Sequence, residues 1–240
     1  MRNLIKKTLP ALLALALTAG CSTSISNIKT KVIGTKYEMP TYDGIFSAKS
    51  SSSKSENGLE VFAAKYKDKS MYEKMPFYKA PISELTFGWE IMLKRGDRLQ
   101  RLTNDSVQDY HPRISQDGTL VVYEKWDKEN KKSDIYKIEL SQSFTPGTSP
   151  SAGTKLTDQE GCENPAISPD GEIIAYNYKG NIWIMDREGK NHKELVKLNA
   201  PTRISDWTDK GLIFHVNNSV GPNAIIDFEK KEIRDYHIGE

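Results

Sequence analysis

The sequence predicts an all-β protein, a β-propeller of about four blade-like repeats, each a four-stranded antiparallel sheet. Three observations predict it. A polar turn ending in glycine recurs between apolar strands, with Gly171 lying 53 residues after Gly118 and Gly211 lying 40 residues after Gly171. A second turn recurs nearby, and its glycines, Gly96 and Gly189, are 93 residues apart, which equals the first two spacings together. A period of about 40 residues with about four short strands per unit is typical of propellers.

Residues 1–20 have the order of a bacterial signal peptide. Arg2, Lys6 and Lys7 form a positive start, and an Ala- and Leu-rich run from Leu9 to Leu17 follows. That run is too short to span a bilayer as a helix, but it fits the apolar region of a secretory signal. We therefore expect residues 1–20 to be a targeting segment rather than part of the fold.

The residues around Cys21 resemble the lipobox of bacterial lipoproteins, in which the cysteine thiol becomes lipidated. The segment Leu17-Thr18-Ala19-Gly20-Cys21 places small residues before the cysteine. By the same resemblance, Ser22 favours sorting to the outer membrane, with the protein facing the periplasm. The alternatives are an ordinary cleaved signal with a chance cysteine, and a buried N-terminal helix.

A polar segment at residues 21–58 follows the lipobox. It is rich in Ser, Lys, Thr and Gly, most of all from Lys49 to Ser55. Such a composition buries too little apolar surface to offset its ordering entropy, so we interpret it as a flexible tether for a propeller domain at residues 59–240. Pro40 to Ser47 could instead form a degenerate turn and strand.

Three turns carry the repeat. They lie at the ends of His111 to Gly118, Asn164 to Gly171 and Arg203 to Gly211, and a strand rich in β-branched residues follows each. Glycine supplies the positive φ of a tight turn, proline presets the backbone, and aspartate bonds nearby backbone groups. We therefore assign structural rather than catalytic roles to the turn residues, which are Asp117, Gly118, Pro169, Asp170, Gly171, Asp209 and Gly211.

Two insertions and an irregular start distinguish the units. A charged hairpin at residues 125–133 and a polar loop at residues 141–154 lie between strands, where added length is tolerated. Residues 55–103 carry only half a recognisable unit, so we expect the N-terminal blade to be incomplete or irregular. A ring of four closes if that unit supplies a missing outer strand. Otherwise an open sheet edge would allow a partner or a homo-oligomer, or the reading frame is a shortened one.

The units resemble the propeller repeat of the TolB family, which runs from Leu-Thr through Ser-Pro-Asp-Gly to an apolar strand ending in an aromatic residue. About 140 residues carry matches. The matching positions are Leu102-Thr103, Ser115 to Gly118, Tyr123, Leu156-Thr157, Ser168 to Gly171 and Tyr176, and the last unit departs at Leu195-Val196 and Thr208 to Gly211. The resemblance implies a periplasmic propeller that serves as a scaffold for protein–protein interactions. TolB itself has six blades and a small α/β domain, and neither fits this chain.

Motifs that carry chemistry are missing from the sequence. There is no Gly-x-Ser-x-Gly elbow, Walker loop or His-Glu-x-x-His pattern. The four histidines occupy unlike positions in their repeats, namely His111, His192, His215 and His237. We therefore expect no catalytic residue, no metal and no cofactor. Cys162 is interpreted as a small packing residue, and with Cys21 lipidated no internal disulfide is expected.

Two functions of different classes follow. The first is a non-catalytic cell-envelope lipoprotein whose propeller binds another envelope protein, with the 125–133 hairpin and the 141–154 loop as contacts. The alternative is a small-ligand or glycan-binding protein, or a lyase-like enzyme, that uses the central channel. We expect the four tryptophans to pack between blades rather than to stack on a ligand. They are Trp89, Trp126, Trp183 and Trp207.

Charge argues against a nucleic-acid partner. The formal net charge is +2 over 240 residues, and removing residues 1–20 takes away three basic residues and no acidic ones, which leaves −1. Nucleic-acid binders are usually markedly basic. A mean hydropathy of −0.59 likewise excludes a protein with several membrane spans.

Overall fold

The computed structural model describes residues 46–50, 52–66, 88–96, 98–105, 107–127, 129–140, 153–217 and 224–235, in which every regular element is a β-strand. Residues 1–20, Cys21 and the start of the tether lie outside the described residues, as do residues 141–152 of the polar loop. Within the described ranges, no helix is long and apolar enough to cross a membrane.

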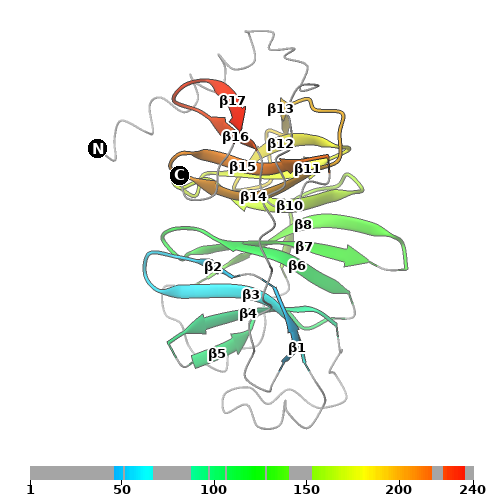
Figure 1. The fold of residues 1–240 in the computed structure, drawn as a ribbon. Coiled ribbons are helices and arrows are strands. Elements are labelled where there is room, and N and C mark those ends of the chain that lie inside the picture. Colours follow the sequence, from blue (N-terminus) through cyan, green and yellow to red (C-terminus); the bar gives the residue numbers. More distant parts are fainter. Residues whose placement is uncertain are drawn as a thin grey trace.

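The strands form four antiparallel sheets, each built from one continuous stretch of chain, and the predicted four-bladed propeller is confirmed (Figure 1). The first sheet contains β1 (Phe46–Lys49), β2 (Ser53–Lys54), β3 (Leu59–Tyr66), β4 (Glu90–Arg95) and β5 (Arg98–Arg101). The second contains β6 (Gln108–Ile114), β7 (Leu120–Asp127), β8 (Lys132–Glu139) and β9 (Thr154–Lys155). The third contains β10 (Cys162–Ile167), β11 (Ile173–Tyr178), β12 (Asn181–Asp186) and β13 (Lys193–Val196). The fourth contains β14 (Thr202–Thr208), β15 (Gly211–Val216), β16 (Ala224–Asp227) and β17 (Glu232–Asp235).

The first sheet corrects the expected boundary of the tether. Both β1 and β2 pair with β3, so two short strands take the place of one inner strand and the sheets begin at or before Phe46 rather than at residue 59. Where the inner strand is interrupted, the Ser50 amide donates to the Ala63 carbonyl at 2.8 Å, and the Ser50 hydroxyl accepts from the Ala63 amide at 2.9 Å. A serine that composition marks as disorder-promoting thus supplies the bonds that a buried β3 requires.

The middle strands of the sheets are buried on both faces. Leu120 and Val122 of β7 pack with the third sheet, whereas Val121 and Tyr123 pack with the first, and all four side chains are 0% exposed. Successive side chains of a strand point to opposite faces, so a strand between two neighbours reads as a continuous apolar run. The core therefore consists of three layers, one between each pair of consecutive sheets.

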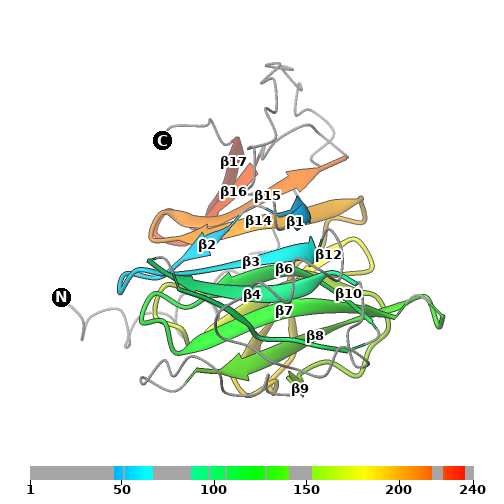
Figure 2. The same cartoon turned by 90° about the horizontal axis from the view of Figure 1, so that it is seen from below.

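Consecutive sheets are also consecutive in space. Figure 1 shows them in chain order from β3–β5 to β14–β17, and β3, β6, β10 and β14 contact one another in that sequence. Seen from below in Figure 2, β9 lies at the outer edge of the second sheet, and β17 completes the fourth sheet. The first and last sheets share no strand among those that the structure describes, so none of the described N-terminal strands is an outer strand of the last blade.

Candidate functional site: a cavity at the turn face

Two of the predicted turns have the same hydrogen bonds. In the second sheet, the Ser115 hydroxyl donates to the Asp117 carboxylate at 2.6 Å and accepts from the Leu120 amide at 3.0 Å. In the third sheet, the Ser168 hydroxyl donates to Asp170 at 2.6 Å and accepts from the amide of Ile173 at 2.9 Å. Each hydroxyl therefore fastens the end of the inner strand to the start of the next strand.

The glycines and prolines complete these turns. The Gly118 and Gly171 backbones both adopt a φ of 74°, in the region that favours glycine, and their amides donate to the carbonyls of Ser115 and Ser168 at 2.9 and 2.8 Å. Pro169 lies inside the third-sheet turn, beside Asp170. Burial raises the pKa of the Asp117 carboxyl, but the hydrogen bonds that this carboxyl accepts from Ser115 and Thr119 lower it more. The pKa of Asp117 is therefore below the ordinary value.

The fourth-sheet turn is different. Here the Lys210 amide donates to the Thr208 hydroxyl at 3.3 Å, while Asp209 is exposed to solvent. Gly211 has a φ of 144° and begins β15 directly, so this turn is tighter than the other two. The assigned residues Asp209 and Gly211 thus lie in a turn, but Asp209 does not make the bonds of Asp117 and Asp170.

Sequence reasoning missed a turn in the first sheet. The Ser55 hydroxyl donates to the Asn57 side-chain oxygen at 2.6 Å and accepts from the Leu59 amide at 3.0 Å, as in the second and third sheets. The signal was present, because Ser55-Glu56-Asn57-Gly58 precedes an apolar strand, with asparagine in place of aspartate. It was hidden in a stretch whose composition indicated a tether.

Neighbouring turns are tied together. The Glu56 amide donates to the Gln116 carbonyl at 2.9 Å, and the Asn57 side-chain amide donates to the Asp117 carbonyl at 3.0 Å. The end of the propeller that carries these turns, which we name the turn face, is therefore cross-linked between the first and second sheets.

A cavity of about 610 Å³ opens at the turn face, and all four sheets line it. Ser53 comes from the first sheet, Arg113 from the second, Ser168 from the third and Trp207 from the fourth. This volume lies within the range of about 300–1,000 Å³ that is usual for ligand pockets. The turns thus surround a common hollow that no single repeat could form.

A bulge in β6 positions Arg113 in this cavity. The register of β6 and β7 shifts between Tyr110 and Arg113, and His111 before Pro112 has a φ of 49°. The residue before proline normally adopts an extended backbone, so the surrounding structure must hold His111 in this conformation. Bulges re-aim side chains beside functional sites. Here the bulge is followed by the one arginine that lines the cavity.

The Arg113 guanidinium is held by two backbone carbonyls. It donates to Pro112 at 3.0 Å and, from a second nitrogen, to the carbonyl of Ser205 in the fourth sheet. Burial lowers the pKa of Arg113, and Arg203 adds to that effect, whereas the carboxylate of Asp206 opposes it. The side chain therefore bridges the second and fourth sheets as a fixed cation.

The third and fourth sheets carry corresponding bulges without a corresponding cation. The register of β10 shifts over Asn164 and Pro165, where Asn164 has a φ of 51°, and that of β14 shifts after Ile204. The positions equivalent to Arg113 are Ala166 and Asp206. Of these three equivalent positions, only the one in the second sheet carries a cation. The cavity is therefore asymmetric.

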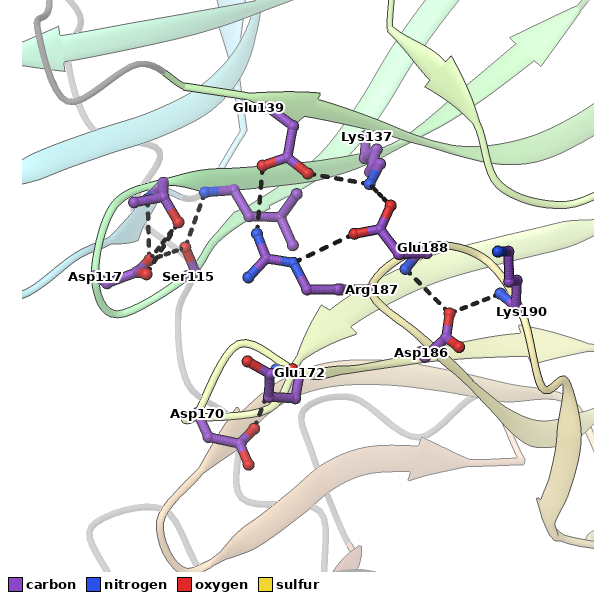
Figure 3. Close-up of polar contacts among 12 residues, drawn as sticks. Ser115, Asp117, Lys137, Glu139, Asp170, Glu172, Asp186, Arg187, Glu188 and Lys190 are labelled. Atoms are coloured by element: carbon purple, nitrogen blue, oxygen red, sulfur yellow. Dashed lines mark hydrogen bonds and ion pairs between the residues drawn. The ribbon is translucent and has the colours of Figure 1, made fainter. Parts of the chain in front are cut away.

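A charged network joins the second and third sheets beside the turns (Figure 3). The ammonium of Lys137 lies 3.0 Å from Glu139 and 2.6 Å from Glu188, and Arg187 lies 3.3 Å from Glu139. Burial lowers the pKa of Lys137, but the carboxylates of Glu188 and Glu139 raise it more, so this pKa lies above the ordinary value. These residues are all paired, so the network fixes the blade interface rather than presenting free charge.

Of the two predicted contact segments, only the hairpin is largely described, because residues 141–152 of the polar loop lie outside the described residues. Because β7 starts beside the Asp117 turn and runs to Asp127, the 125–133 hairpin lies at the end opposite the cavity. Leu140, the last described residue before the loop, is on the cavity side, since its amide donates to the Thr119 carbonyl at 2.7 Å. The hairpin therefore takes no part in the cavity.

The histidines and Cys162 are dispersed. His111 lies 2.9 Å from Glu124, and His192 lies 2.8 Å from the Tyr176 hydroxyl, in different sheets. In the part of the chain that the structure describes, no group of three or more His, Cys, Asp or Glu residues could hold a metal ion. Cys162 is fully buried, and burial raises the pKa of its thiol to about 12.

The aromatic side chains near the site are engaged in packing. Trp207 is 8% exposed and stacks on Phe228, with ring centroids 5.4 Å apart. Trp183 makes an edge contact with Tyr178, and Trp89 a tilted contact with Tyr110. Trp207 therefore offers an edge to the cavity rather than an open face.

Comparison with known proteins gives similarity of fold only. No family model matches the sequence, and no curated protein matches it. TolB from Acinetobacter baumannii is 20% identical, with 67% of this chain and 40% of that chain covered and a TM-score of 0.49. A putative TolB from Agrobacterium tumefaciens is 18% identical, with 62% and 57% covered and a TM-score of 0.42. The gluconolactonase XC5397 from Xanthomonas campestris is 12% identical, with 75% and 58% covered and a TM-score of 0.48.

The matches span 40–58% of the length of those three proteins, so each is longer than the region that it shares with this chain. One of the three, XC5397, is a gluconolactonase, and that activity is a property of XC5397.

Proposed function

We propose that this protein is a non-catalytic, lipid-anchored protein of the cell envelope whose propeller serves as a scaffold for protein–protein interaction, with the turn-face cavity as the docking point. The observation that carries the proposal is the cavity of about 610 Å³ that residues of all four sheets line. Loops at one end of a propeller present a broad and rigid face, which suits recognition of another protein.

Rigidity of the turn face supports this role. The turns at Ser55, Ser115 and Ser168 are each closed by their own hydroxyl, and the first two are bonded to each other through Asn57 and Asp117. A surface that is already ordered loses little conformational freedom when a partner binds. A cavity with such a rim can therefore hold a protruding segment of the partner at low entropic cost.

The envelope location and the anchor rest on the sequence. The order of the positive start, apolar run and lipobox at Cys21 supports lipidation, and the outer membrane facing the periplasm is the location that Ser22 favours. A Cys21→Ala protein is expected to leave the membrane fraction and appear in the soluble periplasmic fraction. Continued fractionation with membranes would contradict the anchor and leave the docking proposal intact.

A second candidate is a small-ligand or glycan-binding protein, or a lyase-like enzyme, that uses the same cavity. The cavity volume favours it, because it suits a ligand of small-molecule size. The buried face of Trp207 disfavours a glycan, since sugars commonly stack on open aromatic rings.

Site-specific photocrosslinking in living cells tests the docking proposal. A photoreactive residue at Gln116, on the cavity wall, is compared with one at Lys131, an exposed position in the opposite hairpin. We expect a discrete protein adduct from Gln116 and none from Lys131. Adducts from Lys131 alone would show that the hairpin, rather than the turn face, binds the partner. Absence of any adduct together with saturable binding of a sugar or small molecule would favour the second candidate.

A further inference from the structure

We propose that the Arg113 guanidinium binds a carboxylate of a partner peptide, at its C-terminus or on an acidic side chain, inside the turn-face cavity. This inference rests on the proposed docking function and names the chemistry of the group that docks. Arginine presents several N–H donors in a planar fork, which matches the geometry of a carboxylate.

The charge of Arg113 is not neutralised by a close partner. Its hydrogen bonds go to the backbone carbonyls of Pro112 and Ser205, and among the described residues no carboxylate lies within 4.0 Å of its nitrogens. Backbone carbonyls orient a guanidinium without cancelling its charge. A cation fixed in this way on a cavity wall is a receptor for an anion rather than part of an internal ion pair.

The acid that acts on the Arg113 guanidinium is not bound to it as an ion pair. Asp206 raises the pKa of Arg113, but one oxygen of the Asp206 carboxylate accepts the Trp207 amide at 2.8 Å and the residue is exposed. Arg203 is a second cation acting on Arg113. Lys54 and Asp209 line the same cavity, so attraction of an anion depends on the fixed donor fork of Arg113 rather than on an excess of positive charge.

Ser53, from the first sheet, supplies a complementary donor beside Arg113. Its oxygen accepts the Ile114 amide at 3.2 Å, which fixes the oxygen beside Arg113 and leaves the hydroxyl proton available for a ligand. A carboxylate has two oxygens and about four acceptor positions, so it can accept from Arg113 and Ser53 together. A neutral amide would bind more weakly, because it carries no charge and has one acceptor oxygen where a carboxylate has two.

The observations favour a peptide over an acidic sugar. The side-chain donors in the lining include serine hydroxyls, Gln116, Lys54 and Arg113, beside two acids, Asp206 and Asp209, while the ring of Trp207 is stacked on Phe228. Peptide carboxylates need a donor set of this kind and no aromatic platform. Binding of a uronic acid instead of a peptide is therefore an outcome that would overturn the proposal.

The bulge before Arg113 fits this assignment. His111 holds a φ of 49° ahead of proline, a conformation that the surrounding structure must maintain. Asn164 makes the same bulge in the third sheet, where the equivalent position is Ala166. The bulge therefore recurs in the repeat, whereas the arginine after it occurs in the second sheet and is replaced by alanine in the third.

Titration with small probes tests the proposal on the full chain. The probe is the tripeptide N-acetyl-Ala-Ala-Ala as its free acid, compared with its C-terminal amide, with N-acetyl-Glu-amide and with galacturonate, by NMR of the arginine Nε–Hε signals. We expect saturable shifts of the Arg113 signal with the free acid or the glutamate probe, and at least tenfold weaker binding of the C-terminal amide. The two acidic probes distinguish a chain terminus from a side chain.

Variants separate recognition from folding. Arg113→Met is expected to weaken the acidic probe at least tenfold, Arg113→Lys to an intermediate degree, and the nearby Arg203→Met by less than threefold. If Arg113→Met fails to fold, the proposal is still tested by Arg113→Lys and by comparing the binding of the tripeptide free acid with that of its C-terminal amide. Equal binding of acid and amide, tighter binding of galacturonate, or unchanged binding by folded Arg113→Met would each overturn the proposal.

The same variants distinguish this inference from the docking function. If Arg113→Met loses the crosslinked partner at Gln116 together with the acidic probe, both stand. If the partner is retained while the probe is lost, the docking function stands and the partner's carboxylate is not what Arg113 holds, so the inference fails. If no partner is captured at the turn face, the docking function fails by itself, and binding of the acidic probe becomes evidence for the small-ligand alternative.

Discussion

The hydroxyl of Thr157 donates a hydrogen bond to the carboxylate of Asp134 over 3.1 Å, and its oxygen accepts the amide of Ile135 over 3.0 Å. Thr103 does the same in the first sheet, where it donates to Glu90 at 2.9 Å and accepts the next backbone amide. The Leu-Thr pair of the repeat therefore has a structural purpose. Its leucine enters the core, and its threonine satisfies a buried backbone donor.

Replacing this hydroxyl should destabilise the fold. In Thr157→Val the side chain keeps its shape, but the buried Ile135 amide loses its partner, while the Asp134 carboxylate loses the hydroxyl and keeps its ion pair with Lys155. We therefore expect the free energy of unfolding to fall by about 1–3 kcal/mol. Thr154→Val, at an exposed position in β9, is the control and should change stability by less than about 0.5 kcal/mol. Urea denaturation measures both, and equal effects would contradict the structural role of Thr157.

Gly211 should tolerate no side chain. Its φ of 144° disfavours any L-residue, and a Cβ there would overlap the carbonyl oxygen of Ile226 in the paired strand β16. Backbone on both sides cannot give way, so we expect Gly211→Ala to cost more than about 3 kcal/mol or to prevent folding. At Gly58, φ is 81° and no atom lies within 4 Å of such a Cβ. Gly58→Ala should therefore cost only about 1 kcal/mol, and a similar loss at both glycines in thermal denaturation would be inconsistent with this packing.

Asp109 should make stability depend on pH. The side chain is 0% exposed, and burial raises the pKa of its carboxyl to about 7, although Lys125, with its ammonium 3.9 Å away, lowers it in part. The other groups facing it are Asp105, which raises the pKa further, and Thr103. The folded protein thus binds this proton more tightly than the unfolded chain does between about pH 4 and pH 7. The free energy of unfolding should therefore decrease as pH rises through that window, by about 4 kcal/mol if no other group compensates.

Asp109→Asn provides the measurement. Asparagine cannot ionise, so denaturation curves between pH 4 and pH 7 should lose this component of the decrease, whereas Asp209→Asn at an exposed turn should leave it in place. A wild-type stability that rises over the same range with an unchanged slope in Asp109→Asn would show that this carboxyl ionises freely in the fold.

Cys162 should be unreactive while the protein is folded. Its side chain is 0% exposed, its thiol lies 3.1 Å from the carbonyl of Gln159, and burial raises its pKa to about 12. The thiolate is the reactive form, so alkylation by iodoacetamide at pH 8 should be slow in buffer and fast in urea. Mass spectrometry of the alkylated peptide distinguishes the two, and rapid labelling of the folded protein would indicate an open site at Cys162.

Much of the fold could be predicted from local sequence. The run Leu120 to Tyr123 and the glycine turns are sufficient to place strands, because side-chain alternation and turn chemistry act between residues close in sequence. The turn at Ser55 escaped prediction because its serines match both a turn and a disordered tether. Composition averages over a window, whereas a hydroxyl of Ser50 or Ser55 acts on one backbone group of β3.

The sequence by itself determined the repeat, the strand order and the roles open to the turn glycines, since these depend on neighbours within a few residues. Only the tertiary structure decided which residues meet. Arg113 and Ser205 are separated by 92 positions, and their contact depends on how the second and fourth sheets pack. The same packing brings residues of all four sheets around one cavity. Packing angles between sheets arise from the shapes of whole core layers, and no local pattern encodes them.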